Sequence, residues 1–267
     1  MSPPPGSFIW YELMTPDANA AARFYGAVVG WQIVDRADPD TPGNDYRMIG
    51  RSDGGTAGGL LQLTPGMQAA GAGPVWLGYL QVTDVQAATQ AIEADGGHTH
   101  MRASLPVGDI AMVSDPMGTV FYVMRPVPPP GRPDAVSDVF HPRNPQHVRW
   151  NELVSPDLAR AKTFYAKHFG FAFNESMPMG PMGDYCFFDH GDVRPGAVMQ
   201  TQKDLPLAGW VFYFGVPSLL AAKQAVETGG GRILMGPHEV PGGDWIVVAT
   251  DPQGVVFGLT GPKGEST

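Results

Sequence analysis

Two kinds of hydrophobic periodicity follow one another in a fixed order along the start of the chain. Residues 8–15, FIWYELMT, alternate as a half-buried strand does. Pro16-Asp17 then precedes a segment whose apolar residues recur at helical spacing until Gly30. The pattern therefore predicts a strand and a helix. Three shorter strand-like segments follow, at 31–35, 46–50 and 58–64, separated by turn-rich stretches.

The same order restarts in the middle of this half. WLGYLQV at 76–82 predicts a strand, and residues 85–97 predict a helix that ends on a glycine pair. Each half of the chain is thus expected to contain two consecutive β-α-β-β-β modules. The last three strands of this second module are predicted at 98–105, 109–114 and 119–124.

The chain is an internal duplication. Residues 10–31, WYELMTPDANAAARFYGAVVGW, return at 150–171 as WNELVSPDLARAKTFYAKHFGF, with Trp, Glu, Leu, Pro-Asp, Phe-Tyr and Gly in register. The ends of the two copies also match, because SDPMGTVFYV near Asp115 corresponds to TDPQGVVFGL near Asp251. A repeat of about 140 residues is too long for a solenoid unit and indicates whole domains. We therefore predict an α+β fold of four βαβββ modules.

A proline-rich segment at 126–146 separates the copies and is predicted to be a semi-rigid linker. Val139 and Phe140 offer apolar anchors by which it could pack on the surface. The predicted organisation is a flexible N-terminus at 1–7, a first domain at 8–125, the linker at 126–146, a second domain at 147–262 and a tail at 263–267.

These repeated motifs resemble the vicinal oxygen chelate superfamily, which includes glyoxalase I, extradiol dioxygenases and bleomycin-binding proteins. The resemblance rests on Trp-x-Glu-Leu in the first strand, Phe-Tyr late in the first helix and D-P-x-G before the last strand, each present twice. It covers nearly the whole chain. It implies two glyoxalase-like domains in which curved mixed sheets surround cavities for small molecules, with the helices outside.

The resemblance also implies four metal-ligand positions in each half. Divalent transition metals need several imidazole, carboxylate or thiolate donors, and an amide oxygen is a poor substitute. None of the corresponding residues is His, Asp, Glu or Cys, so we predict no metal site and no cofactor. The positions fall on Trp10, Gln62, Leu77 and Tyr122 in the first half, and on Trp150, Gln200, Val211 and Gly258 in the second.

A carboxylate is predicted to point into each cavity. Residues i and i+2 of a strand share a face, so Glu12 and Met14 should accompany Trp10, and Glu152 should accompany Trp150. Burial among apolar side chains favours the neutral acid, which makes both glutamates candidate general bases. The alternative is a structural glutamate that satisfies neighbouring donors.

The remaining candidates are residues that would line a ligand cavity. Tryptophan offers a large stacking surface, and glutamine can hydrogen-bond a ligand or a glutamate. Core packing and satisfied buried amides are the structural alternatives. Met-bearing residues 174–184 are a further candidate, as an adaptable lid or as a variable loop. The candidate ligand-binding residues are Trp10, Met14, Gln62, Leu77, Tyr122, Trp150, Gln200 and Val211.

Composition narrows the partners and the compartment. The net charge of −9 without a Lys/Arg cluster argues against nucleic acid and anionic lipid as partners. No apolar run is long enough for a membrane span, and the single cysteine, Cys186, cannot form an intrachain disulfide. We therefore expect a cytoplasmic protein, either a monomer that imitates a dimer or a homodimer.

Three functions remain open from the sequence. The first is metal-independent binding of a small apolar or aromatic metabolite in the cavities. The second is a metal-independent lyase or isomerase that uses Glu12 or Glu152 as general base. The third is a metal-dependent glyoxalase or dioxygenase with non-standard ligands.

Overall fold

The computed structural model describes residues 4–34, 44–132, 134–203 and 207–265. The first half contains β1 (Phe8–Thr15), α1 (Ala18–Val29), β2 (Gln32–Ile33), β3 (Tyr46–Gly50), β4 (Thr56–Gln62), α2 (Pro65–Ala69), β5 (Val75–Gln81), α3 (Val85–Ala94), β6 (His98–Leu105), β7 (Gly108–Ser114) and β8 (Val120–Pro126). The second half contains β9 (Val148–Ser155), α4 (Leu158–Phe169), β10 (Ala172–Pro178), the 3₁₀ turn η1 (Gly180–Met182), β11 (Asp184–His190), β12 (Val193–Gln200), β13 (Gly209–Gly215), α5 (Leu219–Thr228), β14 (Arg232–Glu239), β15 (Trp245–Thr250) and β16 (Val256–Gly261).

Each half forms one mixed sheet of eight strands that does not close. The strand order is β2-β3-β4-β1-β5-β8-β7-β6 in the first half and β10-β11-β12-β9-β13-β16-β15-β14 in the second. Within each module the first strand pairs in parallel with the fourth, as β1 does with β4 and β13 with β16. The other pairs within a module are antiparallel. The predicted α+β fold of four βαβββ modules is confirmed.

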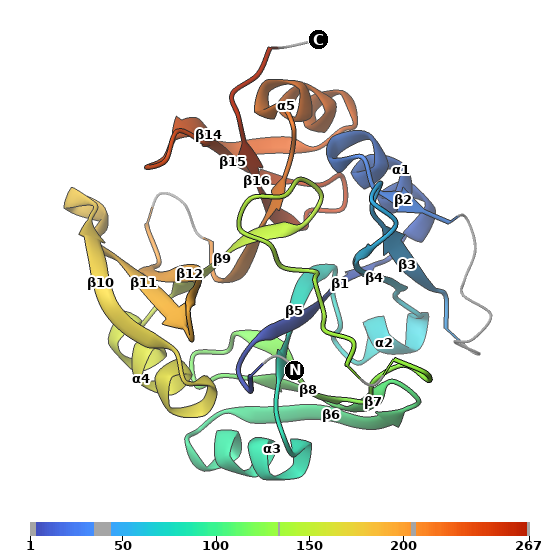
Figure 1. Ribbon diagram of the computed structural model, residues 1–267, viewed down its shortest axis with the longest axis vertical. Helices are drawn as coiled ribbons and strands as arrows, with labels where there is room; N and C mark the ends of the chain where they lie inside the picture. The colour runs from blue at the N-terminus through green and yellow to red at the C-terminus, as the bar shows by residue number, and fades with distance from the viewer. Residues whose placement is uncertain (1–3, 35–43, 133, 204–206, 266–267) are drawn as a thin grey trace. The chain divides into compact units, whose positions relative to one another are not determined.

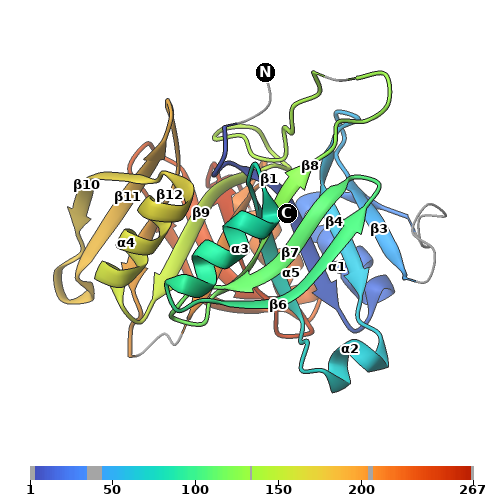
Figure 2. The same cartoon turned by 90° about the horizontal axis from the view of Figure 1, so that it is seen from below.

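The first helix of each half begins and ends where the sequence predicts. The Asp17 side chain accepts a hydrogen bond from the N–H of Ala20, and the Asp157 side chain accepts one from Arg160. Such N-caps satisfy backbone donors that the helix itself leaves unpaired. Gly30 ends α1 in the left-handed region, at φ 84°. Helix α3 packs along β6, β7 and β8, as Figures 1 and 2 show, and α5 packs along β14, β15 and β16, as Figure 1 shows.

Contacts group the modules across the two halves of the sequence. One compact unit comprises Met1–Trp10, Leu77–Ser137 and Asn151–Trp210, and the other comprises Tyr11–Trp76, Asp138–Trp150 and Val211–Thr267. Each unit therefore combines one module of the first half with one of the second. Each hydrogen-bonded sheet consists of strands from one half of the chain. Each compact unit, in contrast, contains one module from each half.

A buried tyrosine–aspartate pair joins the two modules of the first unit. The Tyr165 hydroxyl of α4 donates to Oδ2 of Asp115 at 3.2 Å, and it accepts from Trp210 Nε1 at 3.2 Å. Oδ1 of Asp115 accepts the backbone N–H groups of Met117 and Thr119, both at 2.9 Å. The carboxylate therefore closes the D-P-x-G turn and also holds the helix of the other module.

The second unit repeats this arrangement. Tyr25 of α1 donates to Asp251 at 3.3 Å and accepts from Trp76 Nε1 at 2.9 Å. Asp251 accepts the N–H groups of Gln253 and Val255 at 2.8 and 2.9 Å. In each unit, the tyrosine of a Phe-Tyr motif thus donates a hydrogen bond to the aspartate of a D-P-x-G motif. Trp76 and Trp210 are buried and donate to the two tyrosine hydroxyls, so both serve packing.

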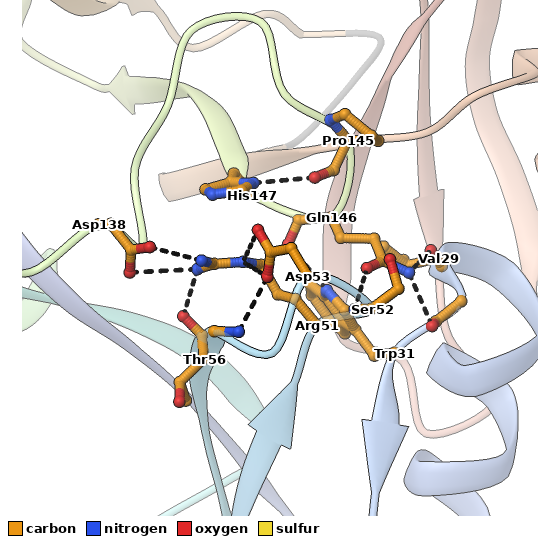
Figure 3. Close-up of polar contacts among 12 residues, drawn as sticks. Val29, Trp31, Arg51, Ser52, Asp53, Thr56, Asp138, Pro145, Gln146 and His147 are labelled. Carbon is orange, nitrogen blue, oxygen red and sulfur yellow. Dashed lines mark hydrogen bonds and ion pairs between the residues drawn. The ribbon is translucent and has the colours of Figure 1, made fainter.

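The segment between the halves is anchored to the second unit by a buried arginine. Arg51 donates through Nη2 to Asp138 at 2.5 Å, through Nε to Asp53 at 3.1 Å and through Nη1 to the Thr56 carbonyl at 2.6 Å (Figure 3). Only 2% of the Arg51 side chain is exposed. A charged group is tolerated at this burial because its donors are paired.

Further contacts hold the same segment by its apolar and amide groups. Val139 is buried, as its apolar character suggested. The Gln146 side chain donates to the Gly30 carbonyl at 2.7 Å and accepts from the Ser52 N–H at 2.7 Å, while the Gln146 carbonyl accepts from Trp31 Nε1 at 2.9 Å (Figure 3). The linker is therefore held at Asp138, Val139 and Gln146, whereas its described residues from Val127 to Asp138 are exposed.

Two local features differ from the sequence prediction. The predicted loop at 174–184 contains the end of β10 and the η1 turn, because residues 175–178 pair with β11. Helix α2 was not predicted, and its five residues are too few to show a helical period. None of the helices in the described ranges is both long and apolar enough to span a bilayer.

Candidate functional site

The alternation predicted for β1 holds in the structure. Tyr11 and Leu13 are fully buried, and the Tyr11 ring packs edge-on against Phe212 at 5.0 Å. Trp10, Glu12 and Met14 therefore share the opposite face of the strand. We call this face, and its counterpart on the other strands, the inner face. Glu12 is 3% exposed and Met14 is 4% exposed.

Glu152 occupies the matching position on β9 and has a specific partner. Its Oε2 accepts a hydrogen bond of 2.6 Å from the Tyr185 hydroxyl of β11. Glu152 is buried, whereas Tyr185 is half-buried. A short hydrogen bond to a charged acceptor is among the stronger polar contacts in proteins. Glu152 and Tyr185 thus form a hydrogen-bonded dyad of one buried and one half-buried side chain.

The first half places a tyrosine at the equivalent position. Tyr46 of β3 lies over Gly59, which is the register partner of Glu12 on β4. A side chain at Gly59 would collide with the Tyr46 phenol, so the glycine makes room for this ring. Sequence reasoning missed both tyrosines. The available signal was the repeated Asp-Tyr at 45–46 and 184–185.

The two candidate glutamines are both engaged at helix starts. Gln62 accepts from the N–H of Ala18 at 2.8 Å and donates to the Pro16 carbonyl at 2.6 Å. Gln200 makes the same pair of contacts, with Leu158 at 3.3 Å and Pro156 at 2.6 Å. These bonds satisfy backbone groups that the helix leaves unpaired, which favours the structural alternative for Gln62 and Gln200.

Gln200 also borders an open cavity beside the start of α4. The cavity has a volume of about 450 Å³, and its lining includes Lys162, Asp184 and Cys186. Cys186 is buried. This cavity lies against α4, so it is distinct from the inner face of β9 that carries Glu152.

Tyr122, at the fourth ligand position of the first half, is stacked on a neighbouring ring. Tyr79 of β5 is its register partner on β8, and the two ring centroids lie 4.2 Å apart at 16°. Phe121 packs on α4 through Phe169 at 5.5 Å, so Tyr122 points to the inner face. Leu77 shares that face with Tyr79 by alternation along β5. Leu77, Tyr79 and Tyr122 are all buried, so this face carries a packed apolar and aromatic cluster.

The second half differs at the corresponding place. Gly258 stands where the first half has Tyr122, and the Tyr213 ring lies over it so closely that a Cβ at Gly258 would collide with the ring. Val211 is buried on β13. Trp150, like Trp10, is half-buried. The inner faces of the two halves therefore present different aromatic arrangements.

Comparison with known proteins identifies the family. The model of the Glyoxalase/Bleomycin resistance protein/Dioxygenase superfamily matches residues 7–122 and again residues 144–259. The chain belongs to this superfamily. The two matched ranges correspond to the two halves of the duplication.

Individual members of the superfamily match over nearly the full chain. The chain is 28% identical over 258 residues to the putative glyoxylase CFP32 of Mycobacterium bovis, covering 95% of this chain and 94% of that protein. It is 28% identical over 268 residues to the anthracycline biosynthesis protein DauV of Streptomyces sp. strain C5, covering 96% and 93%. The Mn(II)-bound glyoxalase of Novosphingobium aromaticivorans has the same fold, with a TM-score of 0.62, 17% identity, and coverage of 98% and 83%.

Divalent transition metals are held by several imidazole, carboxylate or thiolate donors that lie close together. In the described part of the chain, no three His, Cys, Asp or Glu side chains lie close enough together to hold a metal ion. At the first-half ligand positions, Gln62 is committed to the start of α1 and Tyr122 is stacked on Tyr79. Neutral amide and phenol groups are poor ligands for divalent transition metals.

Proposed function

We propose that this superfamily member binds a small planar aromatic metabolite on the inner face of its first-half sheet, without a metal ion. The observation that carries the proposal is the buried stacked pair Tyr79–Tyr122, in which Tyr122 stands at a position predicted from the sequence to correspond to a metal ligand. Aromatic rings favour offset stacking on other planar rings, and small-molecule sites are mostly apolar with few polar groups.

The relatives support an aromatic ligand. DauV is named for anthracycline biosynthesis and shares 28% identity with this chain over nearly its full length. A second protein with that designation, DnrV of Streptomyces peucetius, is 30% identical over 180 residues. We therefore choose a hydroxylated anthraquinone as the probe, because it presents fused planar rings with hydroxyl and carbonyl groups.

Tyr122→Leu is expected to weaken binding of 2-hydroxyanthraquinone about tenfold. The leucine keeps apolar bulk but removes the ring on which the ligand stacks, a loss of about 1.4 kcal/mol. Affinity is measured by quenching of tryptophan fluorescence and by isothermal titration calorimetry.

The matched control is Phe173→Leu. Phe173 contacts Lys162 of α4 through its ring, so it lies on the helix-covered face of β10, and its replacement should leave affinity unchanged. Native protein dialysed against EDTA should bind as before. Loss of binding on dialysis with recovery on adding a divalent metal, or equal losses in the two variants, would contradict the proposal.

The Glu152–Tyr185 dyad favours a second function, proton abstraction by a metal-independent lyase or isomerase. The Glu152 carboxylate can take a proton from the carbon next to a carbonyl, and the Tyr185 O–H, which donates to Glu152 at 2.6 Å in the unliganded chain, can turn to donate to the resulting enolate oxygen. The 7% exposure of Glu152 limits competing solvation.

Glu152→Gln is expected to slow exchange of a ketone α-proton for deuterium about 100-fold, because the amide cannot accept the proton. The measurement is proton NMR of 2-tetralone in deuterated buffer, with Glu12→Gln as the matched control from the first half. Tyr185→Phe should slow exchange less than Glu152→Gln does. If the native chain exchanges the probe no faster than buffer, the catalytic alternative is wrong and the binding proposal stands.

A further inference from the structure

Gln81 is a buried amide on β5 whose side-chain oxygen has no hydrogen-bond partner among the described residues. Its exposed fraction is 8%. Buried polar groups are nearly always paired, so an exception in an ordered strand requires an explanation.

The backbone of Gln81 is firmly held, in contrast to its side chain. Its N–H donates to the Ser7 carbonyl at 2.9 Å, and its carbonyl accepts from the N–H of Gly6 at 2.8 Å. The strand position is therefore fixed by pairing on both backbone groups. The side-chain oxygen is a preorganised acceptor on a rigid element.

Alternation along β5 places Gln81 on the inner face with Leu77 and Tyr79. Its register partner on β8 is Met124, two residues beyond Tyr122. The residues that share this face of β5 with the amide are therefore apolar or aromatic, and Tyr79 stacks on Tyr122. An acceptor in such a setting favours a ligand that brings its own donor.

The duplicated half shows that the fold does not require this amide. WLGYLQV in the first half corresponds to WVFYFGV in the second, which places Gly215 at the position of Gln81. Gly215 makes the same two backbone hydrogen bonds, to the His147 carbonyl at 2.9 Å and from the Gln146 N–H at 2.7 Å. The glutamine side chain is therefore an addition specific to the first half.

We propose that Gln81 determines ligand specificity by accepting a hydrogen bond from a hydroxyl group at the edge of a planar aromatic ligand stacked along Tyr79 and Tyr122. The inference rests on the proposed aromatic binding and narrows it to phenols and enols. A site built to pair with a hydroxyl discriminates strongly against the analogue that lacks it, because the acceptor then stays unpaired.

The test compares 2-hydroxyanthraquinone with anthraquinone, which has carbonyl acceptors but no donor. The native chain is expected to bind the hydroxylated probe at least tenfold more tightly. Gln81→Met should reduce this preference to less than about twofold and leave the affinity for anthraquinone unchanged, since Met fits among Leu77, Tyr79 and Met124. Gln86→Met, the same change at an exposed position of α3, should keep the native preference.

The Tm of the unliganded Gln81→Met variant tests whether Gln81 instead stabilises the fold. Removing an unpaired buried acceptor should leave the Tm of Gln81→Met equal to or above that of the native chain. A lowered Tm, or a hydroxyl preference that persists in Gln81→Met, overturns the inference while the aromatic binding proposal stands. If neither probe binds the native chain, the proposed function and this inference fail together.

Discussion

Asp115→Ala is expected to lower the free energy of unfolding by about 3–4 kcal/mol, because the change leaves three donors without an acceptor, two of them in buried hydrogen bonds. The donors are the N–H groups of Met117 and Thr119 and the hydroxyl of Tyr165. Asp115 is 2% exposed, so water cannot readily replace the lost oxygens. Equilibrium unfolding in urea measures the change.

Two matched variants separate the contributions. Tyr165→Phe removes the bond to Asp115 and the acceptor of Trp210 Nε1 but leaves the turn bonds of Asp115 intact, and it should cost about 1–2 kcal/mol. Asp251→Ala makes the same change in the other unit and should cost as much as Asp115→Ala, since its acceptor pattern is the same. A loss below about 1 kcal/mol for both aspartates would show that these turns do not hold the modules of each unit together.

The aspartates also give a defined pH dependence. Burial raises the pKa of Asp115 and of Asp251, although the turn N–H groups oppose the shift. A carboxyl whose pKa is higher in the folded chain contributes stability below its ordinary pKa of about 3.9, and this contribution is lost as pH rises toward the folded value. The destabilisation by Asp115→Asn should therefore be smaller at pH 7 than at pH 4. A larger destabilisation at pH 7 would contradict this assignment.

Asp53→Ala combined with Asp138→Ala is expected to destabilise the chain by about 3–5 kcal/mol, because it leaves the buried Arg51 guanidinium without a counter-charge. The Arg51 side chain is 2% exposed, whereas those of Asp53 and Asp138 are 53% and 68% exposed. The partners can return to water when the arginine is removed. The arginine cannot do so when the partners are removed.

Arg51→Met provides the matched comparison. It should cost only about 2 kcal/mol, mainly for the lost hydrogen bonds, including the bond to the Thr56 carbonyl. The two variants are compared by urea unfolding under the same ionic strength. If Arg51→Met lowers the free energy of unfolding more than the double aspartate variant does, Arg51 stabilises the chain through packing of its aliphatic stem and not through charge compensation.

Much of the fold was predictable because its signals are local and repeated. The strand at 8–15 and the helix that ends at Gly30 follow from alternation, an Asp N-cap and a glycine stop. Helix α2 was missed since its only local signal is Thr64 capping a proline-initiated turn. The contacts of Tyr25 with Asp251 and Tyr165 with Asp115 join residues that no local pattern connects.

The site was predictable only where strand alternation decides direction. Alternation placed Glu12 and Glu152 on the same face as Trp10 and Trp150. It could not show that the amides of Gln62 and Gln200 turn toward helix starts, because that depends on how a helix packs beside β4 or β12. The bond from Tyr185 to Glu152 joins β11 to β9 across the intervening strand β12. Alternation along a single strand could not predict this bond either.

The grouping of modules across the halves has a genetic consequence. A polypeptide that stops after residue 125 would contain one whole family repeat, yet Tyr25 would lack Asp251 and Phe24 would lack Phe257. Such a truncated product should be insoluble by itself and should become soluble when the other repeat is co-expressed as a separate chain. One family repeat is therefore expected to be too short to fold by itself, because each compact unit takes one module from each repeat.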